Sequence, residues 1–192
     1  DKGERVSSAV PYGYMKSPDN PKQWIVDEPV AEIVRYIYKL CLEGLGPTQI
    51  AKRLTKERIL TPTAYSMSLG KSVSNKNITD PYKWVTETVK RILADRQYTG
   101  CTVNFKSTIL SYKVHKKIKN DESKWQIIPN TQEAIIDEDT FNRVQELRNG
   151  RRRNTATGRT SLFSGLAYCA DCGSKLYFCA SKSIAEDKEF FR

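Results

Sequence analysis

The chain has 192 residues and carries 32 lysines and arginines against 22 aspartates and glutamates, which gives a formal net charge of +10 and a pI near 9.4. A chain of this length can form one ordinary domain with a small appendage, and it does not need disulfides to stabilise its core. The mean hydropathy is −0.59 and the sequence has no long apolar run, which excludes a transmembrane helix. Five unevenly spaced cysteines argue against a secreted disulfide framework. We therefore expect a cytoplasmic protein without a signal peptide.

The positive charge is concentrated in the middle of the chain. Residues 62–119 hold 11 basic and three acidic side chains, whereas residues 120–150 hold three basic and seven acidic ones. A second basic group, Arg151-Arg152-Arg153, follows. A charged run is usually only a solvated face. The size of this asymmetry nevertheless predicts a surface that binds a polyanion.

The first third of the chain predicts a connector and two helices. Residues 1–11 are polar and are interpreted as a connector, followed by a short extended piece. A helix is expected after Asp27, which favours the N-cap position, with Pro29 in its first turn. Its apolar residues have helical spacing and are Val30, Ile33, Val34, Ile37, Tyr38 and Cys41. A second helix over 47–58, joined to the first by a Gly-containing turn, suggests a helix-turn-helix arrangement.

The next segment combines a loop and a third helix. Residues 61–83 are rich in turn-forming residues, which predicts a long exposed loop carrying Lys71, Lys76 and Lys83. A third helix is expected over 85–95, with a buried side made of Trp84, Val89, Ile92 and Leu93. Its outward residues are Thr86, Glu87, Thr88, Lys90 and Arg91. This helix is the best candidate for one that lies against DNA.

Beyond residue 100 the hydrophobic period changes from helical to alternating. Short strands are expected at 101–105, at 110–114 and at 125–128, forming a small antiparallel sheet with one basic face that includes Lys113 and Lys116. In the first strand, Cys101, Val103 and Phe105 are expected on the apolar side. His115, the one histidine, is expected to be an ordinary polar residue.

The last part of the chain predicts one more helix, a linker and a new unit. Asp137 is expected to cap a fourth helix, whose inner face would hold Phe141, Val144 and Leu147 and which would end near residue 150. Residues 151–161 have the composition of a basic linker, and a separate unit is expected over 162–192.

The strongest local motif is Cys169-Ala170-Asp171-Cys172-Gly173. A C-x-x-C-G turn can place two thiolates on one metal ion, but tetrahedral zinc needs four ligands. The alternatives are a redox pair, which would need a thioredoxin-like context, or two free thiols. We favour a zinc half-site, with Cys169 and Cys172 as ligands and the remaining ligands beyond Arg192. Cys41 and Cys101 are interpreted as core residues.

The motifs occur in an order that resembles the large serine recombinases, most of all their transposon-encoded resolvase and invertase branch. The blocks that carry the resemblance are Pro11–Tyr14, Glu32–Tyr38, Gly46–Leu54, Trp84 with Thr88–Leu93, Tyr98–Gly100, Ala134–Phe141 and Tyr168–Gly173. Two departures concern the third helix. Val85-Thr86 replaces a Ser-containing start, and Arg96 stands where a proline is common.

The resemblance implies an α+β fold: a helix-turn-helix-like part with a small antiparallel sheet, followed by a partial zinc ribbon. Residues 1–11 would connect to a missing catalytic domain that carries the nucleophilic serine, so this chain would be inactive alone. Residues 12–150 would form the DNA-binding recombinase domain, residues 151–161 a basic linker and residues 162–192 a truncated zinc ribbon.

The expected function is recognition of one recombination half-site for the integration or excision of a mobile element in a bacterial, nucleoid-associated protein. The partner would be double-stranded DNA, with no membrane partner. The full-length protein would act as a dimer or tetramer, with this chain alone as a monomer. The expected DNA-binding residues are Arg5, Tyr12, Lys71, Lys76, Lys83, Thr86, Thr88, Lys90, Arg91, Arg96, Lys113, Lys116, Arg151, Arg152 and Arg153. Two alternatives stay open at this point: an RNA-binding basic domain, and a non-catalytic protein-interaction module.

Overall fold

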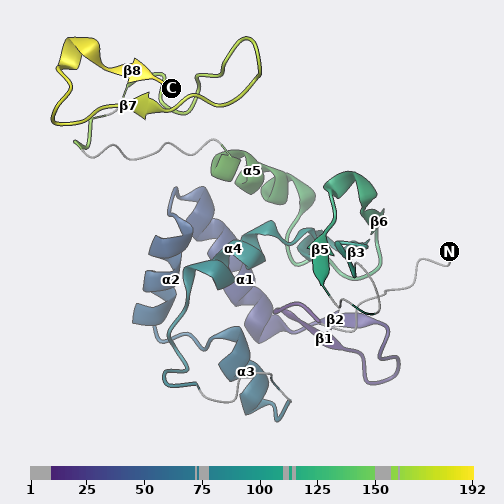
Figure 1. The fold of residues 1–192 in the computed structure, drawn as a ribbon. Helices are drawn as coiled ribbons and strands as arrows, with labels where there is room; N and C mark the ends of the chain where they lie inside the picture. The colour runs from purple at the N-terminus through teal and green to yellow at the C-terminus, as the bar shows by residue number, and fades with distance from the viewer. Residues whose placement is uncertain are drawn as a thin grey trace. The chain divides into compact units, whose positions relative to one another are not determined.

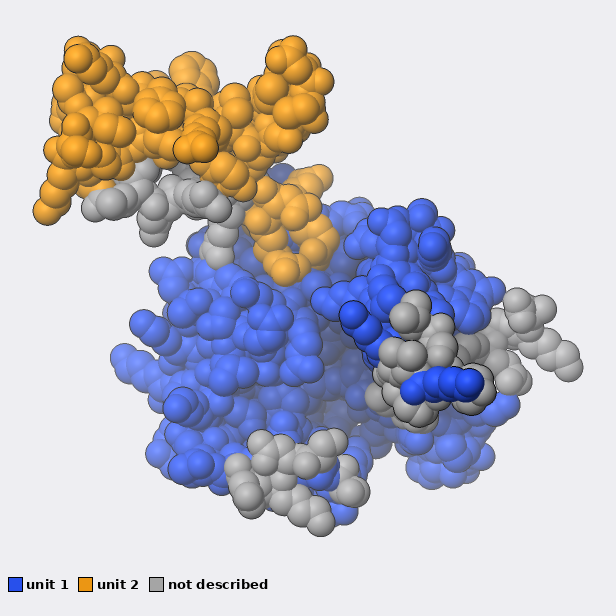
Figure 2. All heavy atoms as spheres, viewed as in Figure 1, with its two compact units in different colours: residues 1–144 blue, residues 145–192 orange. Residues whose placement is uncertain are grey.

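The computed structural model of the chain combines helices with short antiparallel strands, which confirms the α+β class (Figure 1). It describes residues 10–71, 73, 78–109, 113, 116–149, 157–159 and 161–192. The chain divides into two compact units, residues 1–144 and 145–192 (Figure 2). The expected domain limits at 12–150 and 162–192 stay predictions. In the described part of the chain, no helix is both long and apolar enough to cross a membrane.

Four of the five α-helices in the described residues lie where the sequence predicts them. The five are α1 (Glu28–Leu42), α2 (Pro47–Lys56), α3 (Pro62–Ser68), α4 (Thr86–Ala94) and α5 (Glu138–Asn149), with short 3₁₀ turns at Arg96–Thr99, Glu122–Lys124 and Glu186–Lys188. The sequence predicted all of the α-helices except α3. At the start of α5, the Asp137 side chain accepts a hydrogen bond from the Thr140 amide at 2.7 Å, as expected of an N-cap.

The strands pair two by two instead of forming one three-stranded sheet. The antiparallel pairs are β1 (Tyr14–Lys16) with β2 (Trp24–Val26), β3 (Thr102–Asn104) with β6 (Gln126–Ile128), β4 (Ser107–Ile109) with β5 (Lys117–Lys119), and β7 (Phe178–Cys179) with β8 (Phe190–Phe191). The expected strand at 110–114 lies almost wholly outside the described residues. Strands of three residues carry too little periodicity to fix their partners from sequence.

The predicted alternation of the strand at 101–105 is only partly right: Cys101 and Val103 are buried as expected, at 4% and 6% exposed, but the other predicted positions are wrong. Thr102 and Asn104, expected outside, are 1% and 5% exposed, whereas Phe105 is 50% exposed. The Thr102 hydroxyl lies 2.8 Å from the Thr131 hydroxyl, so a hydrogen bond compensates its burial. Phe105 has a φ of +58°, which ends the alternation and turns its side chain outward.

A single core holds α1, α2 and α4 together in the first unit. The apolar stripe of α1 is buried as expected, and α2 packs against both α1 and α4. The Tyr38 hydroxyl donates to the Ile92 carbonyl at 3.2 Å, which joins α1 to the end of α4. Each large apolar side chain that is fully buried stabilises the fold by about 1.5–3 kcal/mol. The core therefore fixes one side of α4 and leaves its other side outside.

The expected loop over 61–83 begins instead with a helix. Thr61 accepts a hydrogen bond from the Ala64 amide at 3.3 Å, and Pro62 occupies the first turn, where no amide donor is needed. The Thr-Pro pair that suggested a turn is therefore the start of α3.

Asp27 stands at the N-cap position of α1, but its side chain does not cap the helix. The carboxylate is 5% exposed and accepts a hydrogen bond from the Tyr65 hydroxyl of α3 at 2.8 Å. The predicted capping role of Asp27 is thus replaced by a tertiary contact that attaches α3 to the start of α1.

The second unit is small and contains β7, β8 and the cysteine turn. Arg159 binds Glu186 at 2.6 Å and Glu189 at 2.8 Å, so the end of the expected linker segment is attached to this unit.

One predicted inner residue of α5 is not buried. Leu147, expected on the inner face of this helix, is 38% exposed.

Candidate nucleic-acid interface

The candidate interface is the outer side of α4. Glu87, Lys90, Arg91 and Ala94 are exposed and lie at i, i+3, i+4 and i+7, so they form one stripe, which we call the α4 stripe. On the opposite side, Val89, Ile92 and Leu93 are at most 5% exposed. Because the core fixes that side, the α4 stripe is held in one orientation.

The two basic residues of the α4 stripe differ in their partners. The Lys90 ammonium lies 3.5 Å from the Glu87 carboxylate, and both side chains are more than half exposed. Such an exposed ion pair contributes little to stability. Arg91 is also exposed, and among the described residues no hydrogen-bond or ion-pair partner holds its guanidinium. Arg91 is therefore available to an external acceptor.

A groove of about 250 Å³ runs beside α4. It is lined by Pro11, Tyr12, Pro62, Thr88, Arg91, Ile92, Asp95 and Tyr98. The start of the described chain and the start of α3 thus meet α4 next to Arg91. Thr88 is half-buried in this groove, whereas Thr86, on another side of the helix, lies 3.3 Å from the Thr48 hydroxyl of α2.

Tyr12, an expected DNA-binding residue, lies in an aromatic cluster. Its hydroxyl donates to the Leu60 carbonyl at 3.4 Å, and its ring meets Tyr65 and Trp84 edge to face at 6.2 and 6.0 Å. Burial raises the pKa of the Tyr12 phenol well above its usual value. The structure therefore gives Tyr12 a packing role, and its contact with DNA stays a prediction.

Arg96, also expected to bind DNA, is held by an acidic side chain. Its guanidinium lies 2.7 Å from the Glu138 carboxylate, which connects the 3₁₀ turn after α4 to the start of α5. Its side chain is 39% exposed, so part of it still faces solvent.

The remaining described lysines of the prediction are all exposed. They are Lys71, Lys83, Lys113 and Lys116. The expected DNA-binding residues did not include Lys117 and Lys119, which lie on the same face of β5 and are exposed. Their spacing of two residues was the signal for a shared face. Arg5, Lys76, His115 and the group Arg151, Arg152 and Arg153 lie outside the described residues.

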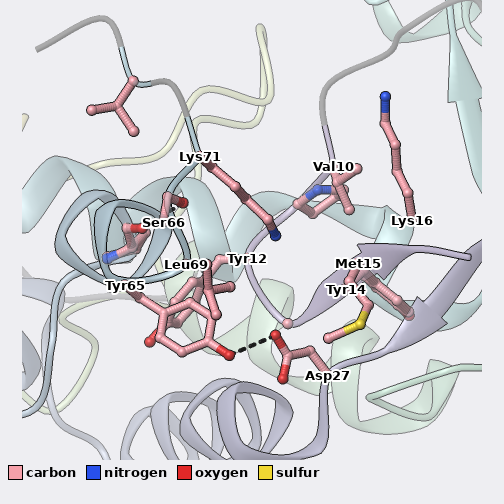
Figure 3. Close-up of a pocket in the computed structure, with 14 residues that line it drawn as sticks. Val10, Tyr12, Tyr14, Met15, Lys16, Asp27, Tyr65, Ser66, Leu69 and Lys71 are labelled. Atoms are coloured by element: carbon pink, nitrogen blue, oxygen red, sulfur yellow. Dashed lines mark hydrogen bonds between the residues drawn. The ribbon is translucent and has the colours of Figure 1, made fainter. Parts of the chain in front are cut away.

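A second pocket, of about 810 Å³, lies between β1 and α3 (Figure 3). The side chain of Lys71 extends into it, and the Asp27 carboxylate on its wall is hydrogen-bonded to Tyr65. Lys16 also lines it. Because both charge signs are present, the lining selects neither anions nor cations clearly.

Cys169 and Cys172 lie in a tight hydrogen-bonded turn. The Cys169 amide donates to the Ser174 carbonyl at 2.8 Å, the Gly173 amide donates to the Cys169 carbonyl at 2.9 Å, and Gly173 has a φ of +67°. Hydrogen bonds from Ser174, and from Cys169, lower the pKa of the Cys172 thiol, which favours the thiolate that metals bind.

The other cysteines do not complete a metal site with this turn. Cys179 is in β7, in register with Phe190, and Cys41 and Cys101 are buried as expected. Within the described ranges, no group of three or more His, Cys, Asp or Glu side chains could hold a metal.

Comparisons with known proteins place this chain among recombinases. No curated protein sequence matches it significantly. A solved structure described as the crystal structure of an LSR–DNA complex is 21% identical with a TM-score of 0.49, over 98% of this chain and 48% of the other. Another, on the sequence requirements of the Listeria innocua prophage attP site, is 22% identical with a TM-score of 0.49, over 98% and 65%. This chain therefore spans about half to two thirds of those chains. The family model described as Recombinase matches residues 28–151, and the chain belongs to that family.

Proposed function

We propose that residues 12–150 bind double-stranded DNA and recognise one half of a recombination site for a serine recombinase. Family membership over 28–151 supports this role. The observation that carries the proposal is the α4 stripe, in which an exposed Arg91 without a described partner stands on a helix whose other side is fixed in the core.

The proposed docking follows from the size of the helix and the charge around it. An α-helix is about 10–12 Å across with its side chains, and the major groove of B-DNA is about 12 Å wide. With α4 in the groove, Arg91 can donate two hydrogen bonds to the O6 and N7 atoms of guanine. Lys71, Lys83, Lys113 and Lys116 are on loops or a hairpin, where they would contact phosphates and position the domain.

Cleavage and rejoining of DNA would belong to another part of the recombinase. That whole protein would act as a dimer or tetramer on paired half-sites in the bacterial cytoplasm. The described residues contribute the recognition surface, and the chain alone is expected to bind DNA as a monomer without cutting it.

We also propose that Cys169 and Cys172 are two ligands of a structural zinc ion. Their turn and the lowered pKa of the Cys172 thiol fit a cysteine-rich zinc site. Bound zinc would join this turn to further ligands and so stabilise the second unit.

The test is a binding competition. A half-site is first selected from a random duplex library with this chain. The chain is then titrated at several salt concentrations against the selected duplex, a scrambled duplex and a structured RNA. We expect the selected duplex to bind most tightly, with an affinity that falls steeply as salt increases.

Variants separate base contacts from phosphate contacts. Arg91→Ala is expected to weaken the selected duplex by about 1–3 kcal/mol and to reduce discrimination. Lys83→Ala should weaken all duplexes alike and lower the salt slope by about one. Lys39→Ala removes the same charge from α1 and serves as the control. Equal affinity for RNA and both duplexes would contradict the proposal and favour an RNA-binding or general basic surface.

A further inference from the structure

We infer that Glu87 is a specificity-determining residue of the α4 stripe, where it selects a cytosine and rejects base edges that present only acceptors. This inference rests on the proposed function. Glu87 is an acidic residue in the basic segment 62–119, so its charge opposes binding to a polyanion.

Three acidic residues occur among residues 62–119, and two of them have roles in the fold. The Asp80 carboxylate accepts a hydrogen bond from the Tyr82 amide at 2.9 Å and organises the turn before α4. Asp95 caps the following 3₁₀ turn and binds the Lys106 ammonium at 2.8 Å. Replacement of either residue would therefore disturb local structure.

Glu87 differs from both. Its side chain is 73% exposed, and its described contact is the ion pair with Lys90 at 3.5 Å, on its own helix. No loop or neighbouring element uses this carboxylate in the described part of the chain. Apart from this exposed ion pair, the carboxylate faces solvent on the surface that faces the proposed partner.

The position of Glu87 on α4 matches that of a base-reading residue. It lies in the first turn of the helix, and the N-terminal residues of a recognition helix come closest to the base edges. Arg91, four residues later, is about 6 Å further along the helix axis, close to the length of two base-pair steps. The two side chains can therefore read neighbouring positions in one groove. Lys90 holds Glu87 from the side and reduces its repulsion from the phosphates.

The chemistry of a carboxylate determines which base groups can form hydrogen bonds with it. An ionised Glu has acceptor oxygens and no donor, so in the major groove it favours the amino group of cytosine. The O6 and N7 atoms of guanine and the O4 atom of thymine are acceptors and would repel it. Glu87 therefore adds discrimination mainly by penalising the wrong base, while Arg91 adds attraction to guanine.

An acidic residue in the first turn also stabilises its helix through the helix dipole. The test therefore needs a readout that a change in helix stability alone would not alter. A change in base preference at one position of the site is such a result.

The experiment uses the selected half-site and a panel of duplexes in which each base pair is replaced in turn. The variants are Glu87→Gln and Glu87→Ala. The matched control is Glu28→Gln, which removes an acidic residue from the first turn of α1, where Glu28 is paired with Arg35 at 2.9 Å. Thermal unfolding of each variant reports any change in folding.

We expect the unmodified chain to prefer cytosine at one position by about fivefold or more. Glu87→Gln should move that preference toward adenine, because Gln pairs with the N6 and N7 atoms of adenine, and should tighten binding to scrambled duplex. Glu87→Ala should remove the preference and also tighten non-specific binding. Glu28→Gln should leave the pattern of base preferences unchanged.

Unchanged preferences in both folded Glu87 variants, with half-site binding retained, would overturn this inference and leave the proposed function intact. Equal affinity of the unmodified chain for the selected duplex and for RNA would overturn the proposed function itself.

Discussion

Removal of the Tyr65 hydroxyl tests the tertiary contact that attaches α3 to α1. The Tyr65→Phe substitution keeps the ring and its edge contact with Tyr12 at 6.2 Å, but it leaves the Asp27 carboxylate without its 2.8 Å donor. Asp27 is only 5% exposed but lines the pocket between β1 and α3, so water from that pocket replaces only part of the lost bond. A hydrogen bond to a charged group contributes about 1.5–3 kcal/mol. We expect the free energy of unfolding to fall by about 2 kcal/mol and the midpoint temperature by about 4–8 °C.

Urea unfolding and calorimetry measure this loss, and a double-mutant cycle assigns it to the pair. In the Asp27→Asn background the acceptor is neutral, so Tyr65→Phe should cost about 1 kcal/mol or less. A loss below about 0.5 kcal/mol in the unmodified chain, or no coupling between the two substitutions, would refute the assignment of a buried charged hydrogen bond.

Three further predictions concern the backbone, pH and metal. Gly100→Ala should lower the free energy of unfolding by more than Gly44→Ala does. Both glycines have a positive φ, but a Cβ at Gly100 would lie 2.8 Å from the Gln132 carbonyl oxygen, whereas a Cβ at Gly44 would meet no atom within 4 Å. Urea titration of both variants measures the difference. Burial raises the pKa values of the Tyr12, Tyr65 and Tyr98 phenols above the unfolded value of about 10. The folded state therefore keeps these protons to a higher pH than the unfolded state does. Stability should then be fully present below about pH 10 and decline as the pH rises further, as followed by urea midpoints. Native mass spectrometry should find zinc bound at less than one equivalent, and a tight one-to-one complex would show that ligands besides Cys169 and Cys172 complete the site.

The helices of the core could be predicted because their signals are local. The stripe from Val30 to Cys41 and the set Val89, Ile92 and Leu93 repeat with helical spacing. Such spacing is satisfied by a helix with one buried side. The structure places these residues in the core as expected. The Asp137 cap of α5 is equally local and was correctly predicted.

Elements without periodicity could not be predicted in the same way. α3 has seven residues with one buried side chain, Ala64, so no apolar stripe marks it. The strands of three residues fit several partners, and only tertiary contacts select one. The burial of Thr102 shows the same dependence, because its hydroxyl tolerates burial only where Thr131 lies opposite.

The residue types of the candidate interface followed from sequence, since the helical period alone separates Lys90 and Arg91 from the buried side of α4. Their charge partners did not follow, because ion pairs depend on which side chains the fold brings within reach. Arg96 meets Glu138 across 42 residues, and Tyr12 packs against Trp84, so both are committed to contacts within the protein. Arg91 has no such described partner. Local spacing determined which residues α4 presents, and only the tertiary structure decided which of the basic and aromatic candidates remain available to a ligand.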